Sequence, residues 1–197
     1  TPNWLAARRG LLTASRMADA IAVLKTGKSS ESRRKLMYEL LAERVTGTAV
    51  EHFVTDAMQW GLDRQADAIE RYECQTGELV GPEVFVIHPR IDWFGATPDG
   101  TVSHDGLIEV KCPTTPKYLA WLAAGEVPDE HKPQMLVQLA CTRRQWVDFV
   151  AFDPRIRRGP QLWIKRYEPP AEEIEKIEAA AIAFLDELAA MEAAFVS

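Results

Sequence analysis

The sequence has no long hydrophobic run, and this absence is the first constraint on its function. A transmembrane helix needs about 18 or more consecutive apolar residues, and no segment of this 197-residue chain reaches that length. Residues Thr1 to Arg9 include a tryptophan and two arginines but not the apolar centre of a signal peptide. We therefore expect a cytoplasmic protein with no membrane partner.

Clustered metal-binding cysteines and histidines are missing as well. The three cysteines, Cys74, Cys112 and Cys141, lie far apart and form no C-x-x-C motif. A zinc ribbon or a cysteine-bound iron–sulfur cluster is therefore not expected. The four histidines also lack ligand spacing, so any metal ion would be a hard cation such as Mg²⁺ (or Mn²⁺) held by carboxylates.

The chain also lacks an overall positive charge. Its net charge of −6 differs from the basic surface of a protein that simply coats nucleic acid. Basic residues cluster only locally, at Arg143-Arg144, at Arg155-Ile156-Arg157-Arg158 and at Lys165-Arg166. Such clusters are typical of a solvated surface, but they can also contact phosphates while acids elsewhere hold a metal ion.

With 47% hydrophobic residues, the chain can form one domain with a substantial core. Its first part, residues 1–80, is expected to be mainly helical. Capping residues and apolar spacing predict helices that begin after Thr13 or Ser15, after Ser30 or Ser32, and after Thr55 or Asp56. The second helix is expected to end near Gly47 and the third at Gly77.

Residues 81–168 are expected to contain the sheet. Strands are predicted over 84–87, 91–97, 101–102 and 107–112, and their short turns indicate an antiparallel meander. Helices over 118–125 and 133–142 follow, and then strands over 146–152 and 161–167. This order predicts an α+β fold with a central mixed sheet flanked by helices.

The last segment, residues 171–197, is predicted to form an amphipathic helix. Apolar residues recur there at steps of three and four, which suits packing on the same domain or on a neighbouring molecule. These positions are Ile174, Ile177, Ala181, Phe184 or Leu185, Leu188 and Met191.

The central segment carries the residues with the clearest chemistry. Thr97-Pro98-Asp99-Gly100 is followed by Glu109-Val110-Lys111, and alternation along a strand places Glu109 and Lys111 on one face. Asp99 and Glu109 can hold a divalent ion together with the carbonyl of Val110, and Lys111 can orient a water or stabilise charge. The alternative is an exposed Asp-Gly turn beside a surface Glu-x-Lys pair.

Several further segments occur in a fixed order around this centre. The first is Trp4 to Ser15, with the pattern W-x-x-x-R-x-G-x-(I/L)-T-A-S, and the others are Gln59-Trp60-Gly61, Ala96 to Gly100, Leu107 to Pro113, the Gln134/Gln138 helix, and Phe152-Asp153-Pro154. Together they resemble the λ-exonuclease-type or YqaJ-like viral recombinases of the PD-(D/E)xK nuclease superfamily, over nearly the whole chain. The resemblance implies a single nuclease domain, 1–197, with a restriction-endonuclease-like core.

The resemblance implies roles for individual residues of the centre. Asp99 and Glu109 would be metal ligands, and Lys111 would be the catalytic lysine. Gln134 matches a glutamine near the active site of the family, and Gln138 is a weaker second match.

The resemblance also implies a binding site for the 5′-phosphate of DNA, formed by Arg8, Ser15 and Thr97. A guanidinium offers a fork of donors to phosphate, and a helix start adds backbone N–H groups. Without the resemblance, Arg8 would be interpreted as a surface arginine and Ser15 as a helix N-cap.

One position departs from the family pattern. A glutamate is expected four residues after Trp60-Gly61 as a further metal ligand, and Gln65 stands there instead. A neutral amide is a poorer ligand for a hard cation. Three explanations of Gln65 are open. The chain is a variant weakened to trap bound DNA, or it is a natural enzyme with a reduced second-metal site. In the third explanation another acid, Asp63, Glu70 or Glu73, replaces the missing glutamate as a metal ligand. Helical geometry disfavours these three acids.

The expected activity is that of a Mg²⁺-dependent 5′→3′ exonuclease, which degrades one strand of double-stranded DNA from 5′-phosphorylated ends and leaves a 3′ single strand for recombination. By resemblance, the enzyme would be a ring-shaped homotrimer in a bacterial or phage-infected cell, working with a single-strand annealing protein. The alternatives are an endonuclease of the same superfamily and a catalytically impaired DNA-end-binding protein.

Overall fold

A computed structural model describes residues 8–24, 26–50 and 53–196 of the chain. The first residues of the N-terminal motif, Trp4 to Ala7, lie outside the described part. None of the described helices is long and apolar enough to cross a membrane.

The structure contains two mixed sheets. The larger has the strand order β2-β5-β6-β7-β8, in which β6 and β7 are parallel and the other neighbours are antiparallel. The smaller has the order β1-β4-β3, with β1 parallel to β4. The strands are β1 (Leu12–Thr13), β2 (Val80–Gly81), β3 (Val86–Ile87), β4 (Phe94–Ala96), β5 (Gly100–Val102), β6 (Gly106–Lys111), β7 (Trp146–Phe152) and β8 (Leu162–Tyr167). The predicted mixed sheet is therefore confirmed.

The prediction of one antiparallel meander is wrong. The hairpins β3–β4 and β5–β6 do form, but the chain leaves the small sheet after β4 and enters the large one at β5. The strands predicted over 84–87 and 91–97 are also longer than the observed β3 and β4. Pairing explains the difference, because β4 takes β1 from the N-terminal part of the chain as its second neighbour.

Two helices begin and end where local capping predicts, whereas the helix predicted over 118–125 begins three residues before its predicted start, at Thr115. Helix α3 (Glu31–Thr46) is capped by Ser30, whose hydroxyl accepts from the N–H of Arg33, and α4 (Asp56–Thr76) is capped in the same way by Thr55. Both end at a glycine in the left-handed region, Gly47 and Gly77. The other helices are η1 (Ala14–Arg16), α2 (Met17–Ala20), α5 (Thr115–Ala124), η2 (Asp129–His131), α6 (Lys132–Thr142) and α7 (Ala171–Val196).

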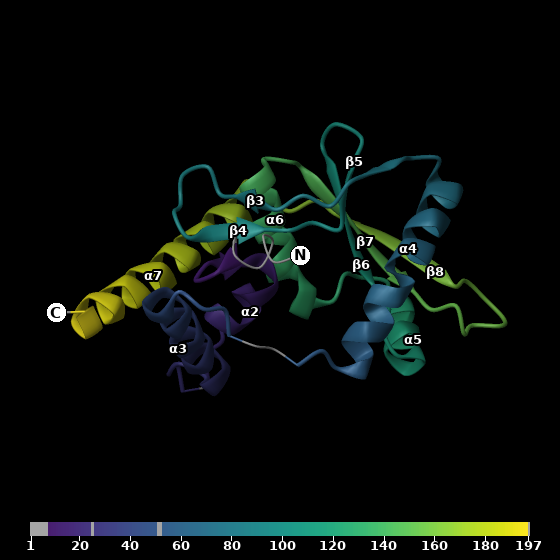
Figure 1. The fold of residues 1–197 in the computed structure, drawn as a ribbon. Helices are drawn as coiled ribbons and strands as arrows, with labels where there is room; N and C mark the ends of the chain where they lie inside the picture. Colours follow the sequence, from purple (N-terminus) through teal and green to yellow (C-terminus); the bar gives the residue numbers. More distant parts are fainter. Residues whose placement is uncertain (1–7, 25, 51–52, 197) are drawn as a thin grey trace.

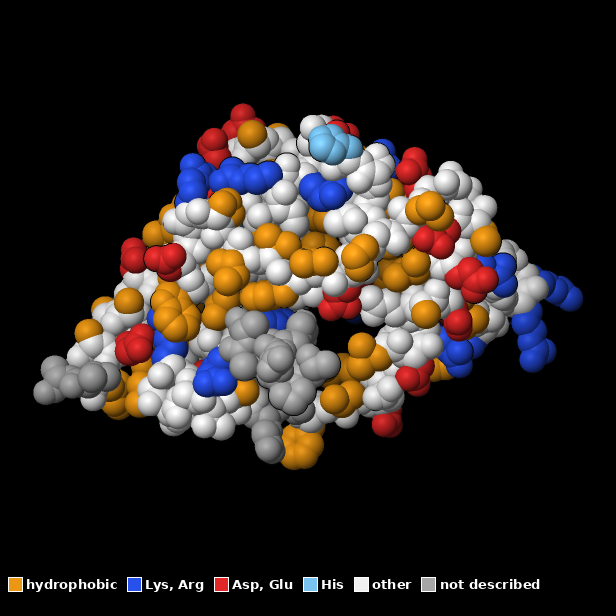
Figure 2. Space-filling model, turned by 45° about the horizontal axis from the view of Figure 1, so that its top comes forward, with side chains coloured by type: hydrophobic (Ala, Val, Ile, Leu, Met, Phe, Trp, Pro, Cys, Tyr) orange, Lys and Arg blue, Asp and Glu red, His pale blue; other side chains and the backbone are white. Residues whose placement is uncertain are grey.

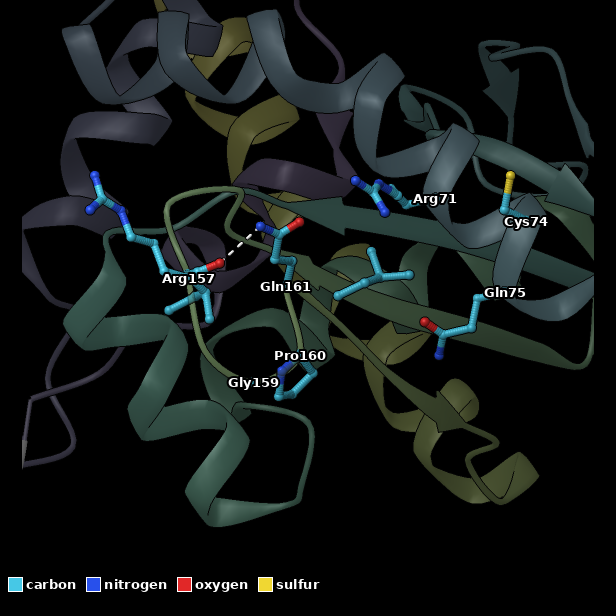
Figure 3. A pocket seen from close by; sticks show the side chains of 9 residues that line it. Arg71, Cys74, Gln75, Arg157, Gly159, Pro160 and Gln161 are labelled. Atoms are coloured by element: carbon cyan, nitrogen blue, oxygen red, sulfur yellow. Dashed lines mark hydrogen bonds between the residues drawn. The ribbon is translucent and has the colours of Figure 1, made fainter.

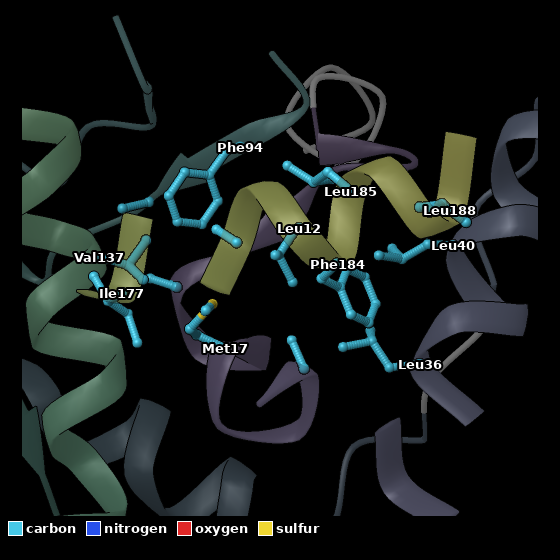
Figure 4. Close-up of a cluster of buried hydrophobic side chains, with 14 of the residues drawn as sticks. Leu12, Met17, Leu36, Leu40, Phe94, Val137, Ile177, Phe184, Leu185 and Leu188 are labelled. Carbon is cyan, nitrogen blue, oxygen red and sulfur yellow. The ribbon is translucent and has the colours of Figure 1, made fainter. Parts of the chain in front are cut away.

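Helix α6 joins the two halves of the molecule (Figure 1). One of its faces packs in a core with β1, α2, α3, β4 and α7, in which Leu12, Phe94, Val137 and Phe184 are almost fully buried (Figure 4). Another face packs with α5 on one side of the large sheet, and α4 covers the opposite side. Burial of each such apolar side chain stabilises the fold by about 1.5–3 kcal/mol.

A buried polar network holds α4 on the large sheet. The hydroxyl of Tyr72 donates to Asp148 Oδ2 at 2.8 Å. Arg166 donates to both carboxylate oxygens of Asp148, at 2.9 and 3.0 Å. Tyr72 and Asp148 are almost inaccessible to solvent, so their charges and dipoles are satisfied within the protein.

Candidate active site

Asp99 lies where the chain passes from the small sheet to the large one. Its carboxylate Oδ2 accepts the N–H of Val110 at 2.7 Å. The register pairs Gly100 with Ile108, so the position opposite Val110 would be Pro98, which has no N–H to exchange. The Asp99 side chain therefore replaces a strand partner. Gly100 is required next to it, since a Cβ there would lie 2.4 Å from Val80 Cγ1.

The carbonyl of Val110 also faces Asp99. Within a β-strand the N–H and C=O of one residue point to the same side, which is why paired residues exchange both bonds. Because the Val110 N–H points to Asp99, its carbonyl oxygen lies on the same side. Strand geometry therefore directs the Val110 carbonyl to the side of β6 on which Asp99 lies, and its role as a ligand stays a prediction.

Glu109 is completely buried on the face of β6 that α6 covers. Its Oε2 accepts the side-chain amide of Gln138 at 2.5 Å, and its Oε1 meets the Lys111 ammonium in an ion pair. Gln138 is also inaccessible to solvent. Glu109 Oε1 has the ion pair with Lys111 but no hydrogen-bond partner in the described structure.

The electrostatics couple Asp99 to Glu109. Burial raises the pKa of Asp99 to about 8, and the negative charge of Glu109 adds to the rise, while Lys111 and the Val110 N–H oppose it. A carboxyl group whose proton affinity is raised by burial and by a neighbouring carboxylate is typical of a metal site, where the cation replaces the proton.

Lys111 remains charged in this environment. Burial alone would lower its pKa, but Glu109 and Asp99 together raise the pKa above the ordinary value. Its ammonium also donates to Gln134 Oε1 at 3.4 Å. Of the two glutamines on α6, Gln138 contacts the acid directly and Gln134 contacts the lysine.

His131, for which the sequence gave no role, lies near this group. Its ring stacks on Phe149 with centroids 5.3 Å apart and meets the edge of Trp121. Burial lowers the pKa of His131 to about 4, and the charge of Lys111 contributes. The imidazole is therefore neutral near pH 7. Its place just before α6 carried no recognisable sequence signal.

Gln65 lies on the face of α4 that packs against the sheet. It is seven residues, about two turns, before the buried Tyr72, so both side chains lie on nearly the same helical face. The acids considered as substitutes are placed otherwise. Asp63 accepts from Gln59 at 2.7 Å on the surface, Glu73 accepts the N–H of Val80 at 2.8 Å, and Glu70 is exposed.

A groove of about 910 Å³ brings Arg8 and Ser15 together, and Asp99, Glu109 and Lys111 are not among the residues that line it. Its lining also includes Thr13, whose hydroxyl is 3.4 Å from that of Ser15. Thr97 is not part of this lining. However, β1 and β4 are parallel with Thr13 opposite Gly95, so Ser15 and Thr97 leave the same end of the strand pair. The Thr97 hydroxyl is buried without a hydrogen-bond partner in the described structure.

The donor set suits a hard divalent cation. Asp99, Glu109 and the Val110 carbonyl supply oxygen ligands, which Mg²⁺ and Mn²⁺ prefer. The buried oxygens Thr97 Oγ1 and Gln138 Oε1 have no protein partner in the described structure. Across residues 8–24, 26–50 and 53–196, however, no group of three or more His, Cys, Asp or Glu side chains is positioned to hold a metal. The site therefore has two carboxylates where three were expected.

Comparison with known proteins identifies the family. Residues 3–145 match the family model of the YqaJ-like viral recombinase domain. A comparison with curated proteins returned no match.

Solved structures show the same fold. LHK-Exo, an alkaline exonuclease from Laribacter hongkongensis, is 41% identical with a TM-score of 0.91, and the alignment covers 99% of this chain and 96% of that one. LHK-Exo in complex with dAMP is 40% identical, with the same TM-score and coverage. A phage-related exonuclease from Haemophilus somnus 129PT shares the fold at 17% identity and a TM-score of 0.64, covering 92% of this chain and 96% of that one. The chain thus belongs to the YqaJ-like viral recombinase domain family and is a λ-exonuclease-like nuclease.

Proposed function

We propose that the chain is a Mg²⁺-dependent (or Mn²⁺-dependent) 5′→3′ exonuclease acting on double-stranded DNA. It would degrade one strand from a 5′-phosphorylated end and leave a 3′ single strand for phage-type recombination by single-strand annealing. The observation that supports this most directly is the Asp99–Glu109–Lys111 group, in which the buried Glu109 forms an ion pair with Lys111 and raises the pKa of Asp99. Arg8 and Ser15 line a groove, and Ser15 leaves the same end of the β1–β4 strand pair as Thr97, two residues before Asp99. The similarity to alkaline exonucleases, one of them in complex with dAMP, supports DNA as the substrate.

In this proposal Asp99, Glu109 and the Val110 carbonyl hold the cation, and Gln65 stands where a further ligand is expected. A bound divalent ion supplies a water activated near neutral pH and stabilises charge in the transition state. Gln138 keeps the Glu109 carboxylate in place by its hydrogen bond.

Lys111 and Gln134 are proposed to act on the reacting phosphate. The ammonium is held between Glu109 and Gln134, so it offers a fixed positive charge at the edge of the acid pair. The positive charge stabilises the negative charge that develops on the phosphate oxygens, and it can orient the attacking water.

Arg8, Ser15 and Thr97 are proposed to receive the 5′-phosphate. A guanidinium and two hydroxyls provide the donors that a terminal phosphate needs. Binding of this phosphate would align the scissile bond, and dependence on it would limit cleavage to DNA ends.

We further propose that the chain acts as a single nuclease domain in the cytoplasm of a bacterial or phage-infected cell. It would assemble as a ring-shaped homotrimer and work with a single-strand annealing protein. Its acidic net charge is compatible with such a ring if the channel itself is locally basic.

One observation favours a second candidate, a DNA-end-binding protein that cleaves poorly. Gln65 is neutral, and the described residues hold no third acid at the site. A weaker metal site would lower turnover without removing the phosphate contacts.

The test uses 5′-phosphorylated linear duplex, the same duplex with 5′-hydroxyl ends, and closed circular DNA, each with Mg²⁺. We expect mononucleotides from the phosphorylated linear duplex only, and Lys111→Ala should abolish turnover but keep DNA binding. Cleavage of the circular DNA would indicate an endonuclease. If the unchanged protein binds the linear duplex but does not cleave it, the result would support the second candidate, a DNA-end-binding protein.

A further inference from the structure

A second basic site lies between α4 and the loop that joins β7 to β8. A hollow of about 430 Å³ is lined there by Arg71, Cys74 and Gln75 from α4 and by Ile156, Arg157 and the residues 159–162. In Figure 3 the side chains of Arg71 and Arg157 lie on opposite sides of Gln161. Both arginines line the hollow, and the guanidinium of Arg157 points away from Gln161 in this view.

The loop leaves the sheet beside the catalytic lysine. Strands β6 and β7 are parallel with Lys111 opposite Ala151, so residues following Phe152 lie at the same edge as those following Lys111. Arg155 confirms this closeness, since it donates to the carbonyl of Pro113 at 2.7 Å. Arg157 is six residues after Ala151, which limits its separation from that strand position to about 20 Å.

Several contacts fix the start and the end of the loop. Buried Asp153 accepts from the Thr115 hydroxyl at 2.6 Å and from Arg155 at 2.7 Å. The guanidinium of Arg155 also lies 4.7 Å from the ring centre of Trp60 on α4. At the other end, the Gln161 amide donates to the carbonyls of Pro154 and Ile156, at 3.1 and 2.8 Å. The loop is thus organised before any ligand binds.

The arginines of this site are exposed and uncompensated. Among the described residues, neither Arg71 nor Arg157 nor the adjacent Arg158 has a side-chain hydrogen bond or ion pair, whereas Arg16, Arg33, Arg44, Arg64, Arg90, Arg155 and Arg166 each pair with an acid. Figure 2 shows Lys and Arg side chains projecting from the end of the molecule that the β7–β8 loop forms in Figure 1. In a chain of net charge −6, such a group is suited to a polyanion.

We propose that Arg71 and Arg157, with Arg158 beside them, bind the phosphate backbone of the duplex that has yet to be degraded. This inference rests on the proposed function, because it assumes that the duplex end is at Lys111. The 20 Å limit corresponds to about six base pairs at 3.4 Å each. The contact therefore falls within roughly one half-turn of the cleaved end and holds the substrate between successive cuts.

The experiment compares two double variants. The first combines Arg71→Gln and Arg157→Gln, and the control combines Arg34→Gln and Lys176→Gln. The control residues are exposed, lie on α3 and α7, and change the net charge by the same amount. Binding of linear duplex is measured by fluorescence anisotropy in EDTA, between about 50 and 200 mM salt. Cleavage with Mg²⁺ is measured in parallel.

The loss of two phosphate contacts should reduce the magnitude of the slope of log K against log salt by about 1.8. Between about 50 and 200 mM salt, the affinity of the double variant for duplex should therefore fall by a factor that is about 12 times smaller than the factor for the wild type. KM for duplex should rise while kcat at saturation stays unchanged. Wild-type affinity and slope in the Arg71/Arg157 variant, or an equal change in the control variant, would overturn the proposal. A lower affinity for inorganic phosphate with unchanged duplex binding would assign the hollow to a free anion and also overturn it.

The outcomes separate this inference from the proposed function. If the wild type binds duplex but does not cleave it, the proposed function fails and the binding comparison still decides the role of the two arginines. If the wild type cleaves and the double variant binds like the wild type, only the role of the arginines is refuted. A wild type that does not bind duplex refutes both.

Discussion

Replacing Gln138 with leucine tests whether the buried amide holds Glu109 in place. The change removes the donor at 2.5 Å from Glu109 Oε2, and a hydrogen bond to a charged group contributes about 1.5–3 kcal/mol. It also removes Gln138 Oε1, a buried oxygen with no partner in the described structure, which relieves about 1 kcal/mol. The net expected loss in the free energy of unfolding is about 1.5 kcal/mol, or roughly 3–6 °C in Tm.

The matched control is Gln134→Leu. Gln134 is only partly buried and its contact with Lys111 is long, 3.4 Å, so its loss should cost less than about 0.5 kcal/mol. Under the proposed function both variants should reduce cleavage of linear duplex, because Gln138 would orient a metal ligand and Gln134 contacts the proposed catalytic lysine. For Gln138→Leu a loss of about 10–100-fold is expected, as for other residues that orient ligands.

The assays are urea and thermal unfolding in EDTA, and cleavage at saturating Mg²⁺. If Gln138→Leu unfolds at the wild-type temperature and cleaves at the wild-type rate, Gln138 does not position Glu109. Equal destabilisation by the two leucine variants would also refute the reasoning, because it would reflect the general cost of changing α6.

Three further predictions follow from the site and its surroundings. Gln65→Glu should raise Mg²⁺-dependent cleavage, because a carboxylate is a better ligand for a hard cation; an unchanged rate and metal dependence would place Gln65 outside the site. Burial raises the pKa of Asp99 to about 8, so Mg²⁺ binding at pH 7 should release close to one proton and strengthen as the pH rises through 8. Calorimetry in buffers of different ionisation enthalpy measures this proton, and Asp99→Asn should abolish it. Finally, Arg166→Ala should cost about 2 kcal/mol, since it leaves Asp148 buried with only the Tyr72 hydroxyl, whereas Tyr72→Phe keeps the ion pair and should cost about 1 kcal/mol. Urea unfolding gives both values, and the reverse order would contradict this account.

The Asp99 prediction has a counterpart in stability. The folded pKa of Asp99 lies above the ordinary carboxyl value of 3.8, so the folded, metal-free protein binds a proton that the unfolded chain releases. This proton stabilises the fold at low pH, and its contribution is lost as the pH rises from about 4 to about 8. Bound Mg²⁺ should restore the stability at the alkaline end.

Local signals in the sequence were sufficient for the helices. Ser30 and Thr55 cap α3 and α4, and Gly47 and Gly77 end them, as predicted, because caps depend on neighbouring residues only. The sheet could not be predicted as well. The partner of β4 is β1, about 80 residues earlier, and no local pattern indicates that pairing.

The candidate site shows the same division. The spacing of Asp99, Glu109 and Lys111 was sufficient to suggest that they meet, since a hairpin joins them. From the sequence, Gln134 was the stronger candidate for the active site and Gln138 the weaker one, yet Gln138 is the residue that contacts Glu109 directly. This depends on the rotation of α6 against β6, which is set by packing of the whole core. His131 and the arginine-lined hollow beside α4 depend on such packing too.

The bond between Asp99 and the Val110 N–H has a consequence for how this enzyme can change in evolution. In the proposed mechanism the Asp99 carboxylate holds the metal ion, and in the structure it also accepts a backbone N–H at the edge of β6, so most replacements of Asp99 should remove activity and also leave that N–H unpaired. Asparagine is the exception, because its amide oxygen can still accept that N–H. A lineage that lost cleavage but kept the fold would be expected to favour asparagine at this position, because replacements without an acceptor lose about 1–3 kcal/mol of stability.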